Sequence, residues 1–253
     1  MPAAFYPAVG FTDMHGDEKT DALYSPMRSR FSSSIARANG YVYDGYFRAE
    51  QKLLFELLDP GAAVVLDACC GSGLMLMPRS DGDHLVFGID FNDAACIAAR
   101  ANGFRIVRGD AFRLPLPDSS VDEIVNCQFF NQQTPEQVRG FIGEAFRVLK
   151  PGGRLILVWR NGAAWIHRAA HFLLTWRDRF LGQPLFPQYT HDIGAVEAII
   201  QQSGGETEYA GVQFAPLSWQ SVKLNSFMAR CIGASNVTVG RKTARPEART
   251  GSD

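Results

Sequence analysis

From Ala62 onward, the chain alternates short apolar runs with segments of helical periodicity. The first run, Ala62-Ala63-Val64-Val65-Leu66, is apolar at every position, as a strand must be when helices cover both faces of its sheet. A chain of 253 residues is long enough for one such domain and short for two that each need a core. The pattern predicts an α/β fold with a doubly wound, mostly parallel, seven-stranded sheet and helices on both faces. Further strands are expected at 85–89, 104–107, 124–125, 155–159, 207–215 and 223–231.

Capping signals mark the helices between these strands. Asn92 precedes an alanine-rich stretch that stops at Asn102-Gly103. Thr134-Pro135-Glu136-Gln137 combines a capping box with a proline at the first helical position. The apolar positions that follow fall on one stripe, so this segment is expected to pack as a helix against the sheet. Two later helices are expected at 164–180 and 192–202.

Composition excludes several classes of protein. The 25 Lys and Arg residues balance 26 Asp and Glu without any block of like charge, which argues against a nucleic-acid partner. The first residues lack the pattern of a signal peptide, and no apolar run approaches the length that crosses a bilayer. We therefore expect a soluble cytoplasmic protein without membrane insertion, as a monomer or homodimer. The 5 cysteines form no repeated CxxC spacing, so reduced thiols are expected.

Acidic residues stand at consecutive strand ends, where open parallel sheets bind their ligands. Asp67 comes directly before the turn Cys69-Cys70-Gly71-Ser72-Gly73, whose glycines let a ligand approach the backbone. A dinucleotide site would need a small residue where Leu76 stands, which disfavours a nicotinamide oxidoreductase. Asp67 favours an ammonium or sulfonium group, Asp90 can accept from both hydroxyls of a ribose, and Asp110 can accept from an adenine amino group. The strand ends therefore predict a nucleoside that carries a positive charge.

Five segments stand in order along the chain: Val64 to Gly73, Gly88-Ile89-Asp90, Gly109-Asp110-Ala111 with Leu114-Pro115, Val121 to Val125, and Leu149 to Gly153. They resemble the motifs of class I, Rossmann-like, S-adenosylmethionine-dependent methyltransferases. They are most similar to the subgroup that includes the ubiquinone and menaquinone methyltransferases, and the likeness covers residues 62–160. The resemblance implies S-adenosylmethionine as the cofactor and S-adenosylhomocysteine as its product.

The resemblance also implies which residues bind the cofactor. Gly71 and Gly73 are expected along its methionine part, Asp90 at the ribose, and Asp110 with Ala111 at the adenine. The other expected contacts are Asp67, Cys69 and Phe91, with Cys127 and Gln128 at the amino-acid end.

On the acceptor side, the resemblance implies methyl transfer to an oxygen, nitrogen or carbon atom of a small aromatic or apolar metabolite. Members of the subgroup often carry histidines after the fourth strand, but here stand Asn131-Gln132-Gln133. His167 and His191 are therefore the candidate bases. His167 with His171 is one helical turn apart, yet no third ligand is marked, so no metal is expected. The candidate acceptor contacts are Tyr43, Phe130, Asn131 and Trp159.

We expect three parts in the chain: a lid over the substrate at 1–50, the cofactor-binding domain at 51–234 with acceptor-pocket helices around 161–204, and a disordered tail at 235–253. Core packing remains the alternative interpretation for each of the aromatic residues named above. Two alternatives to the function stay open: an RNA or protein acceptor, and a regulatory protein that binds the cofactor without turnover. The sequence Asn126-Cys127-Gln128-Phe129 counts against methylation of bases or amides.

Overall fold

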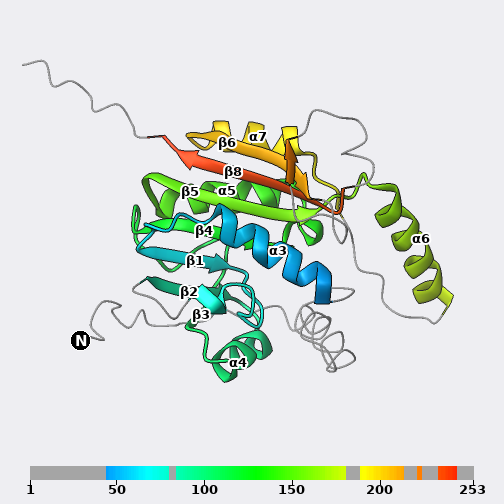
Figure 1. Cartoon of the computed structure of the whole chain (residues 1–253), viewed down its shortest axis with the longest axis horizontal. Helices are drawn as coiled ribbons and strands as arrows, with labels where there is room; N and C mark the ends of the chain where they lie inside the picture. The colour runs from blue at the N-terminus through cyan, green and yellow to red at the C-terminus, as the bar shows by residue number, and fades with distance from the viewer. Residues whose placement is uncertain (1–43, 80–83, 181–188, 214–220, 224–232, 244–253) are drawn as a thin grey trace, which may run out of the picture.

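The strands join in one sheet of order β3-β2-β1-β4-β5-β8-β6-β7, and they lie one below another in Figure 1, from β6 near the top to β3 near the bottom. The computed structural model describes residues 44–79, 84–180, 189–213, 221–223 and 233–243. Strands β1 to β5 run parallel, while β8 pairs antiparallel with both β5 and β6. The strands are β1 Val64–Ala68, β2 Leu85–Asp90, β3 Ile106–Arg108, β4 Val121–Cys127, β5 Leu149–Arg160, β6 Gly205–Gln213, β7 Ser221–Lys223 and β8 Ser235–Lys242.

Helices cover both faces of this sheet (Figure 1). Alternate residues of the central strands point to opposite faces, so Val65 packs toward α3 and Leu66 toward α5 and α7. The expected Rossmann-like α/β fold with a mostly parallel sheet is confirmed, with β7 as a short added edge strand. The helices are α3 Asp44–Leu57, α4 Asp93–Ala101, α5 Pro135–Val148, α6 Trp165–Phe180 and α7 Ile193–Gln202, with short 3-10 turns η1 Met77–Arg79 and η2 Phe130–Gln132.

The helix starts follow the predicted caps. The side chain of Asn92 accepts a hydrogen bond from the backbone N–H of Ala95 at 2.8 Å. In α5, the Thr134 hydroxyl accepts from the Gln137 N–H at 3.3 Å, and the Gln137 side chain accepts from the Thr134 N–H at 2.8 Å. These bonds satisfy donors that the first helical turn leaves unpaired.

The prediction of a disordered tail at 235–253 is wrong for residues Ser235–Lys242. They form β8, whose first six residues are buried between β5 and β6. The segment contains little Leu or Ile, but its run Val237-Thr238-Val239 is β-branched and suits a pleated, covered strand. Residues 244–253 lie outside the described part, as does most of the strand expected at 223–231.

The predicted boundary between a lid at 1–50 and a domain at 51–234 also needs correction. Helix α3 runs without a break from Asp44 to Leu57, so the boundary falls inside one helix. Its residues Tyr46, Phe47, Leu53 and Leu54 are buried against the sheet. Residues 1–43 lie outside the described part of the chain.

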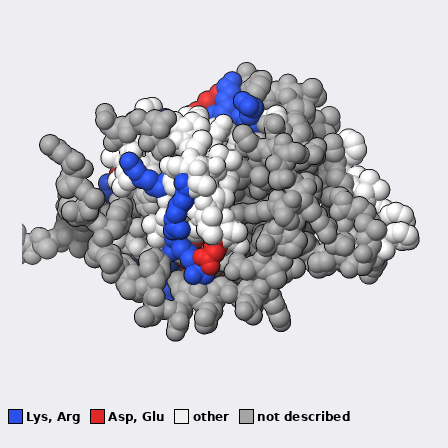
Figure 2. All heavy atoms as spheres, turned by 90° about the horizontal axis from the view of Figure 1, so that it is seen from below, with Lys and Arg blue, Asp and Glu red and all other residues white. Residues whose placement is uncertain are grey.

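Basic side chains form a narrow line on the underside of the molecule (Figure 2). On the edge strand β3, Arg108 is paired with Asp93 of α4 at 2.9 Å. Among the described residues, no helix combines the length and apolar character that crossing a bilayer demands.

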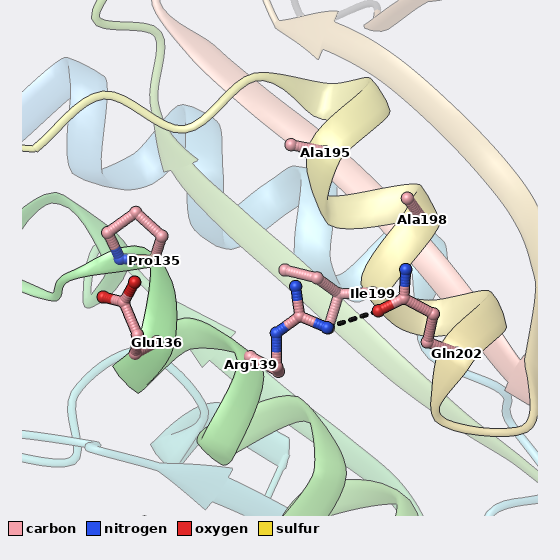
Figure 3. A pocket seen from close by; sticks show the side chains of 7 residues that line it. All are labelled: Pro135, Glu136, Arg139, Ala195, Ala198, Ile199 and Gln202. Atoms are coloured by element: carbon pink, nitrogen blue, oxygen red, sulfur yellow. Dashed lines mark hydrogen bonds between the residues drawn. The ribbon is translucent and has the colours of Figure 1, made fainter.

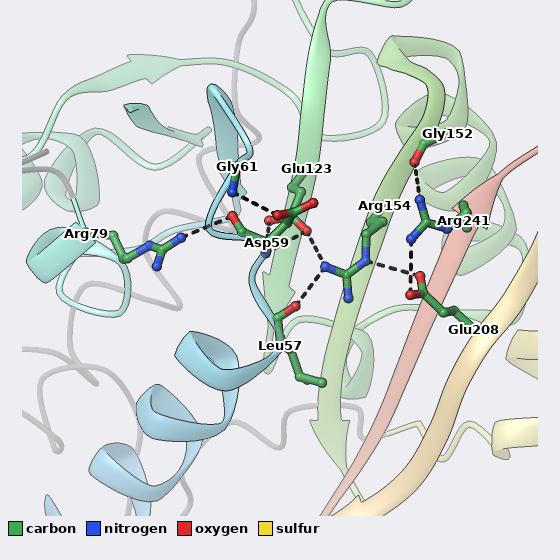
Figure 4. A network of polar contacts seen from close by, with 9 residues as sticks. All are labelled: Leu57, Asp59, Gly61, Arg79, Glu123, Gly152, Arg154, Glu208 and Arg241. Carbon is green, nitrogen blue, oxygen red and sulfur yellow. Dashed lines mark hydrogen bonds and ion pairs between the residues drawn. The ribbon is translucent and has the colours of Figure 1, made fainter. Parts of the chain in front are cut away.

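Ion pairs tie the elements together at the amino edge of the sheet (Figure 4). The Glu123 carboxylate accepts from Arg154 Nη1 at 2.7 Å and from the Asp59 N–H at 3.1 Å. Arg154 also donates to the Leu57 carbonyl at 2.8 Å and pairs with Glu208 at 3.2 Å. Burial raises the pKa of Glu123 although Arg154 acts to lower it. The network thus joins the end of α3 to β4, β5 and β6.

Replacing Glu123 by Ala should destabilise the protein by about 3 kcal/mol, because it leaves the mostly buried Arg154 without its closest carboxylate. Urea unfolding would measure this change. Glu56→Ala is the matched control, since Glu56 forms an exposed pair with Lys52 and should cost no more than about 0.5 kcal/mol. Equal losses in the two variants would contradict the role given to the network.

Candidate functional site

The loop after β1 is held in an unusual backbone conformation. Cys69, Gly71 and Gly73 have positive φ angles of 60°, 57° and 74°. A side chain at Gly73 would collide with the ring of Phe104, so only glycine fits there. Cys69 is a non-glycine residue in the left-handed region, which is uncommon and worth explaining at a ligand site. The loop therefore presents its backbone at the carboxyl end of β1.

Asp90 fixes this loop to the end of β2. One of its carboxylate oxygens, Oδ2, accepts from the Gly71 N–H at 2.8 Å, and the other, Oδ1, accepts from the Asn92 N–H at 2.9 Å. The Cys69 N–H adds a bond to the Ile89 carbonyl at 2.7 Å. The carboxylate is only 7% exposed, so these charge-assisted bonds lie in a region of low dielectric.

Asp67 carries a buried oxygen that lacks a partner. The residue is 1% exposed, and its Oδ2 has no hydrogen-bond partner within the described structure. Burial, and then the charge of Asp90, raise the pKa of Asp67 to about 8. An unpaired polar atom at such depth is costly unless a ligand or water satisfies it.

Three carboxylates surround the thiol of Cys69. Burial raises the pKa of this thiol, and Asp90, Asp67 and Asp110 raise it further through their charges. Asp110 sits in the turn after β3, where its Oδ1 accepts from the Phe112 N–H at 2.8 Å. The structure therefore brings together the three strand-end acids that the sequence singled out.

Two smaller neighbours of these acids were also expected at the cofactor. Ala111 is 6% exposed beside Asp110. The backbone carbonyl of Phe91, which follows Asp90, accepts from Arg108 Nε at 3.2 Å. Both lie in the loops that follow β2 and β3 at the carboxyl edge.

The end of β4 contributes Cys127 and Gln128. Gln128 has a positive φ of 61°, and its N–H donates to the Val158 carbonyl at 2.7 Å. Its side-chain amide donates to Glu50 at 2.6 Å, and the Cys127 thiol lies 3.4 Å from the same carboxylate. Sequence reasoning missed Glu50. The signal was an acidic residue within the buried stripe of α3, four residues after Tyr46 and three before Leu53.

Of the four residues predicted to contact the acceptor, three are buried in the protein and one lies outside the described residues. Phe130 and Trp159 are 1% and 0% exposed and pack against each other with ring centroids 5.5 Å apart. Asn131 is also buried, and its side-chain oxygen accepts from the Arg160 N–H at 3.0 Å. These three residues have packing roles here, because their side chains contact other residues of the protein. Tyr43 lies outside the described residues.

The two candidate bases occupy different surroundings. His191 is buried, and its Nε2 lies 2.9 Å from the carbonyls of both Phe130 and Gln133, so it anchors η2. His167, on α6, has its Nε2 2.9 Å from the Ala234 carbonyl. Burial and the charge of Arg160 lower the pKa of His167. Since a carbonyl only accepts, Nε2 carries the proton in His167 and Nδ1 is the basic nitrogen.

A separate hollow of about 270 Å³ lies between α5 and α7 (Figure 3). Arg139 of α5 reaches across to donate to the Gln202 side chain of α7. None of the strand-end residues lines this hollow, so it is distinct from the site at the carboxyl edge. Its lining residues are Pro135, Glu136, Arg139, Ala195, Ala198, Ile199 and Gln202.

Two solved structures share this fold. A protein from Pyrococcus horikoshii matches with a TM-score of 0.63 and 16% identity, over 87% of this chain and 98% of that chain. Magnesium protoporphyrin IX methyltransferase from Synechocystis, solved with bound S-adenosylhomocysteine, matches with a TM-score of 0.59 and 14% identity, over 89% of this chain and 95% of that chain. These likenesses show a shared Rossmann-like α/β fold.

Sequence comparison shows which proteins the chain is similar to. Residues 66–157 match the family described as a methyltransferase domain. A probable S-adenosylmethionine-dependent methyltransferase of Mycolicibacterium smegmatis is 30% identical over 175 residues, 67% of this chain and 63% of that protein. Demethylmenaquinone methyltransferase of Listeria welshimeri is 31% identical over 104 residues, 37% of this chain and 43% of that protein. The alignments thus span less than two thirds of these relatives. Over these residues the chain is similar to class I S-adenosylmethionine-dependent methyltransferases.

The residues present fit the cofactor of this family. S-adenosylmethionine carries an ammonium and a sulfonium group, and Asp67 offers a buried oxygen without a partner beside the loop. The left-handed backbone at Gly71 and Gly73 leaves no side chain between the loop and a ligand. Asp90 and Asp110 supply carboxylates for hydroxyl and amino donors at the neighbouring strand ends.

Asp67→Asn should stabilise the ligand-free protein increasingly as pH rises. An unfolded Asp titrates near pH 4, so the folded protein holds the Asp67 proton up to about pH 8 and loses stability across that interval. Between pH 5 and pH 8.5 the advantage of the variant over the wild type should grow by about 4 kcal/mol in urea unfolding. A difference in unfolding free energy between variant and wild type that does not change with pH would contradict the raised pKa of Asp67. Glu56→Gln, which changes an exposed acid, serves as the control.

Proposed function

We propose that this chain binds S-adenosylmethionine at the carboxyl edge of β1, β2 and β4 and transfers its methyl group to a small acceptor. The observation that carries the proposal is the arrangement of three carboxylates around the left-handed loop, with the unpaired oxygen of Asp67 at its base. Phosphate would be repelled by this group of acids, whereas a cationic nucleoside would be attracted.

Each strand end takes one part of the cofactor in this proposal. Gly71 and Gly73 line the methionine part, and Asp67 and Cys69 lie below it. Asp90, with Phe91 beside it, takes the ribose. The remaining contacts are Asp110 and Ala111 at the adenine, and Cys127 and Gln128 at the amino-acid end.

The bound cofactor supplies a methyl group already activated on a sulfonium. The protein's task is then to hold the acceptor in line, since positioning alone can supply a large part of the rate. Where the acceptor must lose a proton, His167 is the proposed base. Its lowered pKa keeps the ring neutral, and Nδ1 remains available to take the proton while Nε2 donates to Ala234. His191 is a weaker candidate because it is buried in the packing around η2.

An aromatic or apolar acceptor fits the outer side of the site. Helix α6 directly follows β5 and exposes a face of large apolar side chains. Trp165 and Trp176 are 62% and 65% exposed, and Trp176 stacks on Phe180 with centroids 6.0 Å apart. One relative is named for demethylmenaquinone, a ring-containing acceptor, which supports the same class of acceptor here.

Calorimetric titration with S-adenosylhomocysteine, with NAD as the control ligand, tests the cofactor. Saturable binding of S-adenosylhomocysteine alone is expected, because the acids around the loop disfavour a pyrophosphate. Binding of NAD alone, or of neither ligand, would overturn the proposal. Transfer from methyl-labelled donor to ring-containing acceptors then tests turnover, and binding without any turnover would leave a cofactor-binding regulatory protein.

Asp90→Ala should weaken S-adenosylhomocysteine at least about tenfold, since each lost charge-assisted bond is worth about 1.5 to 3 kcal/mol. The matched control is Asp93→Ala, because Asp93 is a nearby acid whose side chain is 60% exposed and pairs only outward with Arg108. Urea unfolding of both variants separates loss of affinity from loss of fold. Unchanged affinity in a folded Asp90→Ala protein would refute the ribose assignment.

A further inference from the structure

A buried polar cluster lies where three distant parts of the chain meet. Helix α3, the end of β4 and the start of β8 bring together Tyr46, Glu50, Cys127, Gln128 and Ser235, which we call the Glu50 cluster. The cluster lies at the carboxyl edge of β4, the same edge that carries the cofactor site. No role in the fold's sheet or helix pairing requires polar groups at this position.

The Glu50 carboxylate is the acceptor at the centre of the cluster. Its Oε1 accepts from the Ser235 hydroxyl and from the Gln128 amide, the latter at 2.6 Å, while the Cys127 thiol lies 3.4 Å from Oε2. Because Ser235 donates to Glu50, Tyr46 must donate to Ser235, at 2.5 Å. The Gln128 amide also lies 3.3 Å from the Ser235 oxygen.

A carboxylate is a poor choice for this position if packing were its only purpose. Glu50 is 0% exposed and occupies the stripe of α3 that otherwise holds Leu53 and Leu54. Burying the charge carries a desolvation cost that an apolar residue would avoid. Buried charges that persist despite this cost are concentrated at functional sites.

The hydrogen bond from the Gln128 side chain connects the Glu50 carboxylate to the turn that follows β4. The backbone φ of Gln128 is 61°, a value that a residue other than glycine adopts only when its surroundings hold it there. Its N–H is held by the Val158 carbonyl and its side chain by Glu50. Both Cys127 and Gln128 are only partly buried, so the turn that they form borders the surface of the site.

We propose that Glu50 is a positioning residue that holds the Cys127–Gln128 turn in its left-handed form, and that this turn shapes the place of the cofactor's amino-acid end. The proposal rests on the proposed function, because it assigns a task within that site. Glu50 acts on the site through Gln128 and Cys127. Tyr46 and Ser235 in turn fix the orientation of the Glu50 carboxylate.

Calorimetry with S-adenosylhomocysteine on four proteins tests this inference: the wild type, Glu50→Gln, Gln128→Ala and the double variant. Each single change should weaken binding about tenfold, because the turn is released in either case. The double variant should lose less affinity than the sum of the two single losses, since both changes release the same turn. Additive losses, or unchanged affinity in Gln128→Ala, would overturn the proposal.

Two controls separate positioning from stability. The Glu123→Ala variant should be less stable than the wild type, but its change lies at the opposite edge of the sheet. If affinity does not depend on stability, this variant should bind S-adenosylhomocysteine within about twofold of the wild type. Glu56→Gln changes an exposed acid on the same helix and should bind as the wild type does. If Glu50→Gln does not fold, Tyr46→Phe replaces it, because losing the hydroxyl that donates to Ser235 loosens the Glu50 carboxylate and should weaken binding to a smaller extent. A wild type that does not bind the ligand refutes the proposed function itself, whereas normal binding by Glu50→Gln refutes only this inference.

Discussion

The carboxylate of Asp90 is the contact on which the site depends. It accepts from Gly71 in the loop after β1 and from Asn92 at the start of α4, so two loops that come from neighbouring strands share one anchor. Parallel strands bring such loops to a common edge, but they leave the loops' backbone donors unpaired. A buried acid between them satisfies those donors and sets the distance between the loops. The left-handed residues around Gly71 are tolerated because the loop is fixed at this point.

Acidic side chains have opposite surroundings at the two edges of the sheet. At the amino edge, Glu123 is matched by Arg154, and Arg154 is matched again by Glu208 (Figure 4). At the carboxyl edge, Asp67 faces the like charge of Asp90, and burial leaves one of its oxygens without a partner. The first arrangement stabilises the fold by itself. The second is unfavourable while Asp67 is ionised, so in the proposed function a bound cation would recover part of that free energy.

Sequence reasoning succeeded where local chemistry decides the structure. The capping box at Thr134 predicted the start of α5, and the strand-end acids predicted which loops gather around Cys69. It failed where tertiary context decides. The strand β8 has few large apolar residues, and its position between β5 and β6 makes it a buried strand. Glu50 was missed because a single acid in an apolar stripe resembles an exposed position until its partners Gln128 and Ser235 are known.

The place of β8 in the sheet has a consequence for how the protein is made. Strand β8 is synthesised after β6, yet it lies between β5 and β6 and pairs with both. Until it leaves the ribosome, β5 and β6 each present an open edge with unpaired backbone groups, which are sites for aggregation. The parallel half of the sheet can form during translation, but the sheet becomes continuous only when β8 inserts. The contact of Ser235 with Glu50 therefore cannot form until β8 has been synthesised.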